Sequence, residues 1–506
     1  MSRLAGLLIG LCVAVGVPST SAQGIDNDTF ASWRDSDQQV LAQLLRDMPK
    51  GGELHSHLSG AIHFDDLIRI AQQRAYLAAF EKDGTARGFV LPFAAGNPPS
   101  RTTDIQEGCI RGRLVCVAVQ DLDAAQLGAL RAAVTIDGDD ASRTERDGFA
   151  SFQDIFGALS NLTDNADVVP DLVRQAMQDA ADHHVDYLEL KLTPYGRLNS
   201  RIESVKIETF LDSIARAIRD QNAAFASAGR DTVTVRLIAQ VDRRDPQRPG
   251  GATDLAPIAC DSTCHLRPRG AYLYSQLRQA YYLASASRYS DLVVGFDFVS
   301  LPEQDLSTKP ALGYLLGSLR AEFGRANMTV HAGESRRPGW HDHVGQALAL
   351  GADRIGHAVN LEDDLAAWET VCRMGVPIEV NLTSNVLLGV VGRLEEHPFP
   401  RYFNRRSCAV TKTDRDRPTT DPVVLSTDDG GVFQTDMSNE FCLAATTFGL
   451  SWDEVKQLAR NSLAHSFLPA PERRALLQSW EAKISRFEQT WQPKAAAEGC
   501  RVPQVE

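Results

Sequence analysis

The sequence predicts an α/β protein whose core is a closed barrel of eight parallel strands surrounded by helices. Three observations predict this fold: eight short runs are rich in apolar and β-branched residues, amphipathic stretches separate most of these runs, and each run is apolar almost throughout rather than alternating. Strands buried on both faces have this continuous character, which is typical of parallel sheets. Eight strand and helix units favour a TIM-type (β/α)8 barrel.

The eight predicted strands are spread along most of the chain. They are Glu53 to Leu58, Tyr187 to Thr193, Val233 to Val241, Leu292 to Ser300, Met328 to Glu334, Arg354 to Val359, Pro377 to Ser384, and Val423 to Asp429. Amphipathic stretches such as Phe210 to Arg219 and Ala311 to Phe323 predict helices between them. A doubly wound open sheet is the competing fold, but no Gly-x-Gly-x-x-Gly turn follows the first strand.

A long helical insertion is predicted between the first and second strands, over about residues 62–185. The two strands are separated by roughly 130 residues, far more than a connecting loop requires. Within the insertion, Phe64 to Phe80 has a helical period, and Gly88 to Arg113 has the Gly, Pro and Arg content of a loop. A smaller charged excess lies at 398–422. Barrel enzymes elaborate lids and substrate walls in such insertions.

The N-terminus predicts export. Arg3 precedes the apolar run from Leu4 to Val17, and small residues follow, so residues 1–22 have the pattern of a secretory signal peptide that is too short to span a membrane. We expect a partly helical arm at 23–48, the barrel domain at 49–490 and a tail at 491–506. The mature protein is therefore expected to be soluble, without a stable membrane anchor, and periplasmic or secreted.

Charge and cysteine content narrow the partners and the compartment. The net charge of −13 makes the chain a poor nucleic-acid binder. Eight cysteines remain without Cys12, and an exported chain can pair them. Local bridges are predicted for Cys109 with Cys116 and for Cys260 with Cys264, although a zinc knuckle would also explain the latter pair. Cys372, in a helical pattern, is expected to be buried, and the oligomeric state stays open.

Titratable residues gather at the ends of predicted strands. His55 and His57 are two apart on the first strand and so share a face, while His331, His357 and the pair Asp428 and Asp429 end three other strands. A barrel brings all strand C-terminal ends to one rim. Three imidazoles (His55, His57, His331) and one carboxylate (Asp428) suit a zinc ion with an open position for water, whose pKa falls from 15.7 to about 7 on the metal.

The neighbouring residues predict acid–base chemistry beside this ion. Glu334, three residues past His331, can give a proton to a ring nitrogen while hydroxide attacks the adjacent carbon. His357 can orient that hydroxide and take its proton. Asp429 can hydrogen-bond a second heterocycle nitrogen, and two adjacent acids near a cation should differ in pKa.

Five ordered motifs resemble the adenosine/AMP deaminase family of metal-dependent hydrolases. They are Pro49 to Ala61, His331-Ala332-Gly333-Glu334, Arg354 to Ala358, Thr383-Ser384-Asn385 and Ser426 to Asp429. The resemblance implies that His55, His57, His331 and Asp428 bind one Zn²⁺, that Glu334 protonates the purine N1, that His357 positions the hydroxide, and that Asp429 contacts N7. The implied reaction converts adenosine to inosine and ammonia by attack at C6 through a tetrahedral intermediate.

The resemblance also suggests how the substrate, a purine nucleoside, is held, and here the chain departs from the family. Ser59 stands where the family commonly has an Asp that grips the ribose, and Ser300 is matched to a Gly whose backbone reaches N3. Phe152 and Phe156 resemble the aromatic wall, although their helical spacing equally suits core packing. Arg336 and Arg337 leave AMP open as the substrate. A related hydrolase of another aminopurine, or a secreted binder without catalytic activity, would also be compatible with this barrel.

Overall fold

The computed structural model describes residues 25–93, 102–136, 144–243, 268–302, 311–337, 344–403, 422–493 and 499–501. The predicted signal peptide, the Cys260 and Cys264 pair and most of the 398–422 excess lie outside these residues. Within them, no helix is both long and apolar enough to cross a membrane.

Eight parallel strands form the predicted barrel. Their order in the sheet is β1 (Gly51–His57), β5 (Val185–Leu192), β6 (Thr234–Asp242), β7 (Val293–Val299), β8 (Asn327–Ala332), β9 (Arg354–His357), β10 (Ile378–Val380) and β11 (Val423–Leu425). The segment after β11 returns to β1, where the Asp428 amide donates to the His55 carbonyl (2.9 Å) and the His57 amide donates to the Asp428 carbonyl (2.8 Å). These bonds close the ring, so the predicted (β/α)8 barrel is confirmed and the open sheet is excluded.

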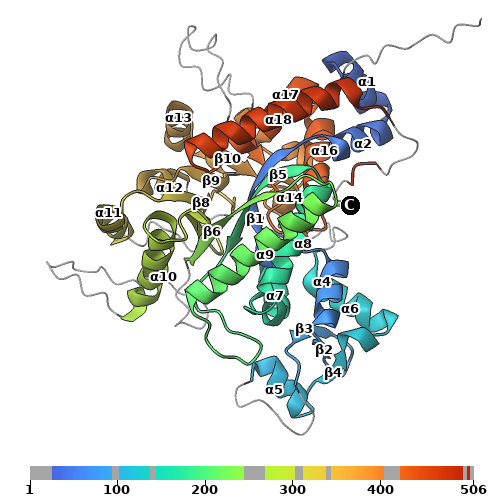
Figure 1. Cartoon of the computed structure of the whole chain (residues 1–506), viewed down its shortest axis with the longest axis vertical. Coiled ribbons are helices and arrows are strands. Elements are labelled where there is room, and N and C mark those ends of the chain that lie inside the picture. Colours follow the sequence, from blue (N-terminus) through green and yellow to red (C-terminus); the bar gives the residue numbers. More distant parts are fainter. Residues whose placement is uncertain are drawn as a thin grey trace, which may run out of the picture.

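Helices follow the strands around the barrel (Figure 1). They are α8 (Val169–Asp182) before β5, then α9 (Ile207–Ser227), α10 (Pro268–Ser285), α11 (Ala311–Phe323), α12 (Val344–Leu350), α13 (Leu365–Met374), α14 (Leu382–Leu387), α15 (Phe399–Phe403), α16 (Met437–Phe448), α17 (Trp452–Ala464) and α18 (Ala470–Thr490). Two strand predictions run furthest past the observed ends: Pro377 to Ser384 is a strand only to Val380, and Val423 to Asp429 only to Leu425. In both cases the chain bends where polar side chains turn toward the barrel mouth.

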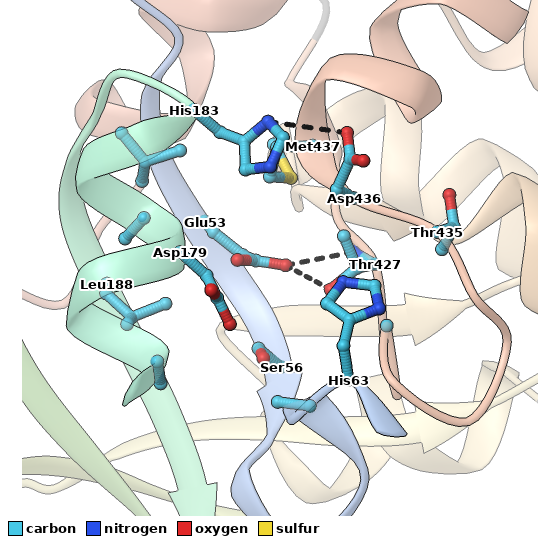
Figure 2. A pocket seen from close by; sticks show the side chains of 15 residues that line it. Glu53, Ser56, His63, Asp179, His183, Leu188, Thr427, Thr435, Asp436 and Met437 are labelled. Carbon is cyan, nitrogen blue, oxygen red and sulfur yellow. Dashed lines mark hydrogen bonds and ion pairs between the residues drawn. The ribbon is translucent and has the colours of Figure 1, made fainter. Parts of the chain in front are cut away.

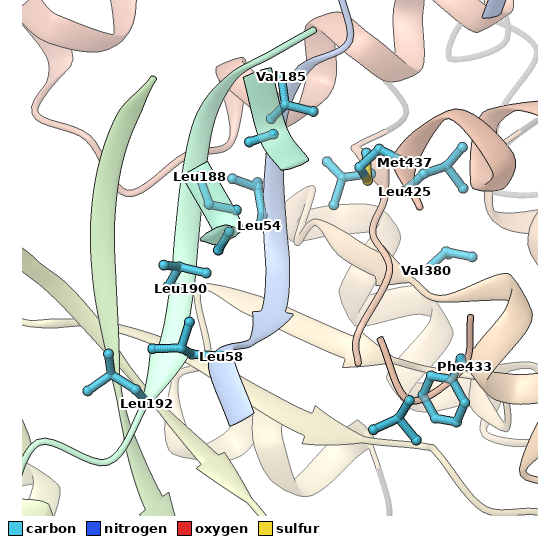
Figure 3. Packing of buried hydrophobic residues seen from close by; sticks show 14 of the residues in the cluster. Leu54, Leu58, Val185, Leu188, Leu190, Leu192, Val380, Leu425, Phe433 and Met437 are labelled. Carbon is cyan, nitrogen blue, oxygen red and sulfur yellow. The ribbon is translucent and has the colours of Figure 1, made fainter. Parts of the chain in front are cut away.

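The core lies between strands and helices, and it explains the continuous apolar runs. Every residue of β5 is buried, as is every residue of β1. Figure 3 shows Leu54, Leu188 and Leu190 from these two strands packed together. Burying each such side chain contributes about 1.5–3 kcal/mol. A strand covered on both faces shows no period of two, which is why its pattern is continuous.

The insertion after β1 contains the predicted helices and, in addition, a small sheet that the sequence did not predict. It contains α3 (Leu58–Ala61), α4 (Phe64–Gln73), α5 (Asp104–Ile110), α6 (Ala124–Val134) and α7 (Glu145–Thr163), and also an antiparallel sheet of β2 (Leu77–Phe80), β3 (Ala86–Val90) and β4 (Val115–Ala118) in the order β3-β2-β4. The predicted helix over Phe64 to Phe80 ends at Gln73, and the predicted loop over Gly88 to Arg113 contains the end of β3 and all of α5. This sheet lies at the bottom of Figure 1.

The N-terminal arm and the disulfides complete the architecture. The arm is helical, with α1 (Asn27–Ser36) and α2 (Gln38–Asp47) packed against α16 and α17. Cys109 and Cys116 form the predicted local disulfide, which ties α5 to β4. Cys442 also pairs with Cys500. Cys372 is half-buried and disulfide-bonded rather than a buried free thiol, which corrects the expectation for it.

Candidate functional site

Four predicted side chains converge at the C-terminal mouth of the barrel. His57 Nε2 lies 3.3 Å from His55 Nε2 and 3.1 Å from His331 Nε2. Asp428 Oδ1 lies 3.1 Å from the Nε2 of His55 and 3.3 Å from that of His57. All four residues are buried. Strands β1 and β8 and the turn after β11 thus bring positions more than 370 residues apart in the chain to one point.

This donor set fits a divalent cation. Ligands about 2.0–2.1 Å from a tetrahedral zinc ion lie roughly 3.3 Å from one another, and the four distances given above are 3.1–3.3 Å. Without a cation, three buried imidazole nitrogens would face one another with too few protons to pair them. Burial lowers the pKa of His331 to about 3, so its imidazole is neutral and keeps a lone pair for a metal.

Each imidazole is oriented through its second nitrogen. His55 Nδ1 lies 2.7 Å from Glu379 Oε2, and His331 Nδ1 lies 3.0 Å from Asp297 Oδ2. The side-chain amide of Gln240 contacts His57 Nδ1. Carboxylates in this position fix the tautomer that presents the Nε2 lone pair to a metal ion.

A buried ion network supports these partners from below. Lys191 Nζ bridges Asp297 Oδ2 (2.7 Å) and Glu379 Oε2 (3.3 Å), and Arg354 Nε donates to Glu379 Oε1 (2.6 Å). Arg354 also pairs with Glu189. With Asp428, the connected network holds four carboxylates and two basic side chains. A divalent cation would balance this excess of negative charge, which is costly in a buried site.

The backbone is strained at the same place. His357 has φ 67° and Asp428 has φ 63°, in the left-handed region that residues other than glycine seldom adopt. Such conformations cost about 1–3 kcal/mol each and persist where the surrounding structure imposes them, most often at functional sites. Ser300 has φ 108°, a conformation that favours glycine, and it occupies the position matched to a family glycine.

The three predicted acid–base residues face this point. His357 Nε2 lies 3.6 Å from Glu334 Oε1 and has no hydrogen-bond partner in the described part of the chain. Glu334 and His357 also approach Asp428. Burial, then the charges of Asp428 and Glu334, raise the pKa of Asp429 well above its usual range. Asp429 therefore keeps its proton to higher pH than an exposed carboxyl group does, and in its protonated form it can donate a hydrogen bond.

Aromatic rings stand beside the acids. Phe152 on α7 is stacked on Phe433 (centroids 5.4 Å apart, 13° between planes) and meets Phe156 edge-on at 4.8 Å. Phe433 follows Asp429 closely, and its amide donates to the Asp429 carbonyl. The insertion thus brings Phe152 to the barrel mouth. Ser59 is half-buried in α3, directly after β1.

A pocket beside β1 is lined by Glu53 and by Thr427, the residue that precedes Asp428. Figure 2 shows Glu53, whose Oε1 accepts from the Thr427 amide (3.1 Å) and from the Thr427 hydroxyl. Burial raises the pKa of Glu53 to about 7. Because Thr427 precedes Asp428, this contact fixes the turn that aims Asp428 into the barrel.

Sequence reasoning missed the supporting carboxylates and lysine. Lys191, Asp297 and Glu379 are each fully buried inside a strand. A charged residue in an otherwise apolar, doubly buried strand is the signal that identifies them, since such a charge must be paired.

Comparisons with known proteins agree with this fold. The family described as adenosine deaminase matches residues 123–265 and 275–483, more than half of the chain. An N6-methyl-AMP deaminase from Danio rerio is 29% identical over 335 residues, covering 64% of this chain and 80% of that protein. Adenosine deaminase 2 from Sus scrofa is 26% identical over 470 residues, covering 89% and 81%. The apo structure of the N6-methyl-AMP deaminase from Arabidopsis thaliana shares the fold, with a TM-score of 0.56, 21% identity and coverage of 88% and 99%.

Proposed function

Because this chain belongs to the adenosine deaminase family, we propose that it hydrolyses adenosine, and deoxyadenosine, to the corresponding inosine and ammonia. The observation that carries the proposal is the convergence of His55, His57, His331 and Asp428 beside Glu334. Water adds to purine C6, the C6–N6 bond breaks, and ammonia leaves.

Zinc is the metal we propose for the four-residue site. Three imidazoles and one carboxylate are ligand types that zinc prefers, and a water molecule would then occupy a fifth position, as in five-coordinate zinc. A bound zinc ion would supply a nucleophile at neutral pH by lowering the pKa of water.

The remaining residues of the site transfer protons or bind the substrate. Glu334 gives a proton to purine N1, so that charge does not build up on the ring during attack. Asp429, whose pKa is raised by burial, donates to N7 in its protonated form, because N7 is only an acceptor. Phe152 and Phe433 provide the flat apolar wall against which a purine packs. The backbone of Ser300 faces N3, and the Ser59 hydroxyl meets the ribose.

The charges at the mouth support a nucleoside over a nucleotide. Arg336 donates to Glu362 Oε1 (2.6 Å) and to the Val359 carbonyl (3.1 Å), and its amide donates to Glu145 Oε2 (3.3 Å). In the described residues of this rim, Arg336 is thus already paired, and two carboxylates would repel a phosphate.

A second candidate substrate is N6-methyl-AMP or AMP, which the name of the Danio rerio relative favours. Ser59 also favours it, because a hydroxyl is a weaker ribose anchor than a carboxylate. A panel of adenosine, deoxyadenosine, AMP, N6-methyl-AMP and adenine, followed by ammonia or methylamine release, tests both. The highest kcat/KM on a nucleoside supports the first proposal. Activity confined to nucleotides overturns it in favour of the second.

We also propose that the chain is exported. The Cys109–Cys116 and Cys442–Cys500 disulfides support an oxidising compartment. Expression of residues 1–506 in a bacterial host, with fractionation and N-terminal sequencing, tests this. Export predicts a mature chain that begins at residue 23, whereas an uncleaved cytosolic chain would contradict it.

A further inference from the structure

We propose that His397 and Asn385 are positioning residues that hold His357 in the tautomer with its proton on Nε2. The two residues form a buried chain of hydrogen bonds between a backbone amide and the His357 ring. The consequence for catalysis rests on the proposed deaminase function, but the tautomer itself can be measured without turnover.

The direction of donation along this series of hydrogen bonds is set at the end that lies farthest from His357. The Phe399 backbone amide lies 3.0 Å from His397 Nδ1. A backbone N–H can only donate, so His397 Nδ1 must accept and carries no proton. His397 is buried, and burial, with the nearby charge of Arg336, lowers its pKa to about 3, so the ring is neutral. Its single proton is therefore on Nε2.

Asn385 continues the series of hydrogen bonds with the same direction of donation. His397 Nε2 donates to Asn385 Oδ1 over 3.1 Å, which turns the Asn385 amide nitrogen toward His357. Asn385 Nδ2 lies 3.1 Å from His357 Nδ1. Because an amide nitrogen only donates, His357 Nδ1 accepts, and a neutral His357 carries its proton on Nε2.

Asn381 favours the other tautomer of His357, with the proton on Nδ1. Its amide is best satisfied when Nδ2 donates to the Ser426 and Val380 carbonyls, which places Oδ1 3.3 Å from His357 Nδ1. Asn385 prevails for two reasons. First, its contact with His357 is shorter. Second, if the Asn385 amide were reversed, its nitrogen would face the Nε2 proton of His397, so two donors would meet. His397 cannot move that proton to Nδ1, because Nδ1 accepts from the Phe399 amide.

The tautomer divides the roles at the site. His357 Nε2 points toward Glu334, where it has no hydrogen-bond partner among the described residues. With a proton on Nε2, His357 can donate a hydrogen bond to a group placed there, and its only lone pair, on Nδ1, is occupied by Asn385. His357 then cannot take a proton from the attacking water, so Glu334 takes that proton and passes it to N1. This assignment replaces the expectation that His357 acts as the base.

Nitrogen-15 NMR of the zinc-loaded, histidine-labelled full chain tests the proposal. His357 is assigned by difference from a His357→Gln sample. We expect a protonated shift at Nε2 and an unprotonated shift at Nδ1. The Asn385→Asp variant replaces the donor with a carboxylate that accepts from both rings, so Nδ1 of His357 should become protonated and kcat should fall about 10²-fold or more, as fixing the wrong tautomer does in serine proteases.

Asn27→Asp, which adds the same charge at the exposed end of α1, should change neither the shifts nor kcat. A protonated Nδ1 in the parent protein would overturn the proposal and identify Asn381 as the dominant partner. Unchanged His357 shifts in Asn385→Asp would also overturn it. If Asn385→Asp does not fold, the spectrum of the parent protein alone decides. A parent protein with the expected tautomer but no activity on any purine would refute the proposed function and leave the tautomer assignment standing.

Discussion

Replacing Gly60 with Ala should disable the site without removing any functional group. A Cβ atom at Gly60 would lie 1.9 Å from Asp429 Oδ1, 2.6 Å from its Cγ and 2.7 Å from its Cβ. Rotation of the carboxyl group cannot relieve the last contact, because the Cβ atom of Asp429 is fixed to the backbone. To reach an ordinary contact of 3.4 Å, Oδ1 must retreat by about 1.5 Å.

This displacement sets the expected loss. A misplacement of about 1 Å in an active site can cost about 10²-fold in rate, or about 2.7 kcal/mol of transition-state stabilisation. We therefore expect kcat/KM for adenosine to fall at least 10²-fold, while zinc content stays at about one ion per chain. Overpacking should also lower the free energy of unfolding by about 1–3 kcal/mol, which thermal or urea denaturation measures.

The matched control is Gly128→Ala in α6. Nothing lies within 4 Å of a Cβ atom built at Gly128, so the variant should gain about 0.5–1 kcal/mol of stability from its helix and keep full activity. A Gly60→Ala enzyme with the kcat/KM of the parent protein would refute the role of Asp429 in substrate binding.

Three further predictions follow from the site and its surroundings. Glu334→Gln should keep metal and fold but lower kcat by at least 10²-fold in steady-state assays; unchanged kcat would refute Glu334 as the proton carrier. His57→Ala should lose the ion by elemental analysis, and chelation of the parent protein should abolish activity until zinc is restored; a chelator-resistant enzyme would contradict a metal-dependent site. Burial lowers the pKa of His183 to about 4, so the folded state holds fewer protons than the unfolded state and stability should fall as pH drops from about 6.5 toward 4, by about 1.4 kcal/mol per unit. Urea titrations at several pH values should show a shallower fall for His183→Gln, and an equal slope would show that His183 does not contribute.

The barrel was predictable because doubly buried strands leave an unmistakable apolar pattern. The sheet in the insertion was not, since Leu77 to Phe80 is apolar and follows a helical period without a turn residue. The left-handed backbone of Ala75 (φ 55°) breaks the helix there, and nothing in the identity of an alanine predicts it. The composition of its surroundings predicts that Gly88 lies in a loop, but it is a residue of β3. A side chain does not fit there, because a Cβ atom would lie 2.2 Å from the Ala158 carbonyl oxygen of α7.

The inner site was predictable for a different reason. The four proposed metal ligands, His55, His57, His331 and Asp428, lie at or near the C-terminal ends of strands. The topology of a parallel barrel brings these ends together, independent of the conformation of the loops. Their partners Glu379 and Asp297 lie deeper in strands that are buried on both faces. Sequence alone does not tell which face of such a strand turns inward, so these contacts required coordinates.

Anomalous X-ray diffraction at the zinc absorption edge, from crystals of the purified protein, tests the central claim most directly. We predict one strong peak, bonded to the Nε2 atoms of His55, His57 and His331 and to a carboxylate oxygen of Asp428. Zinc-supplemented crystals that show no peak among these four residues, or a peak bound elsewhere, would contradict it.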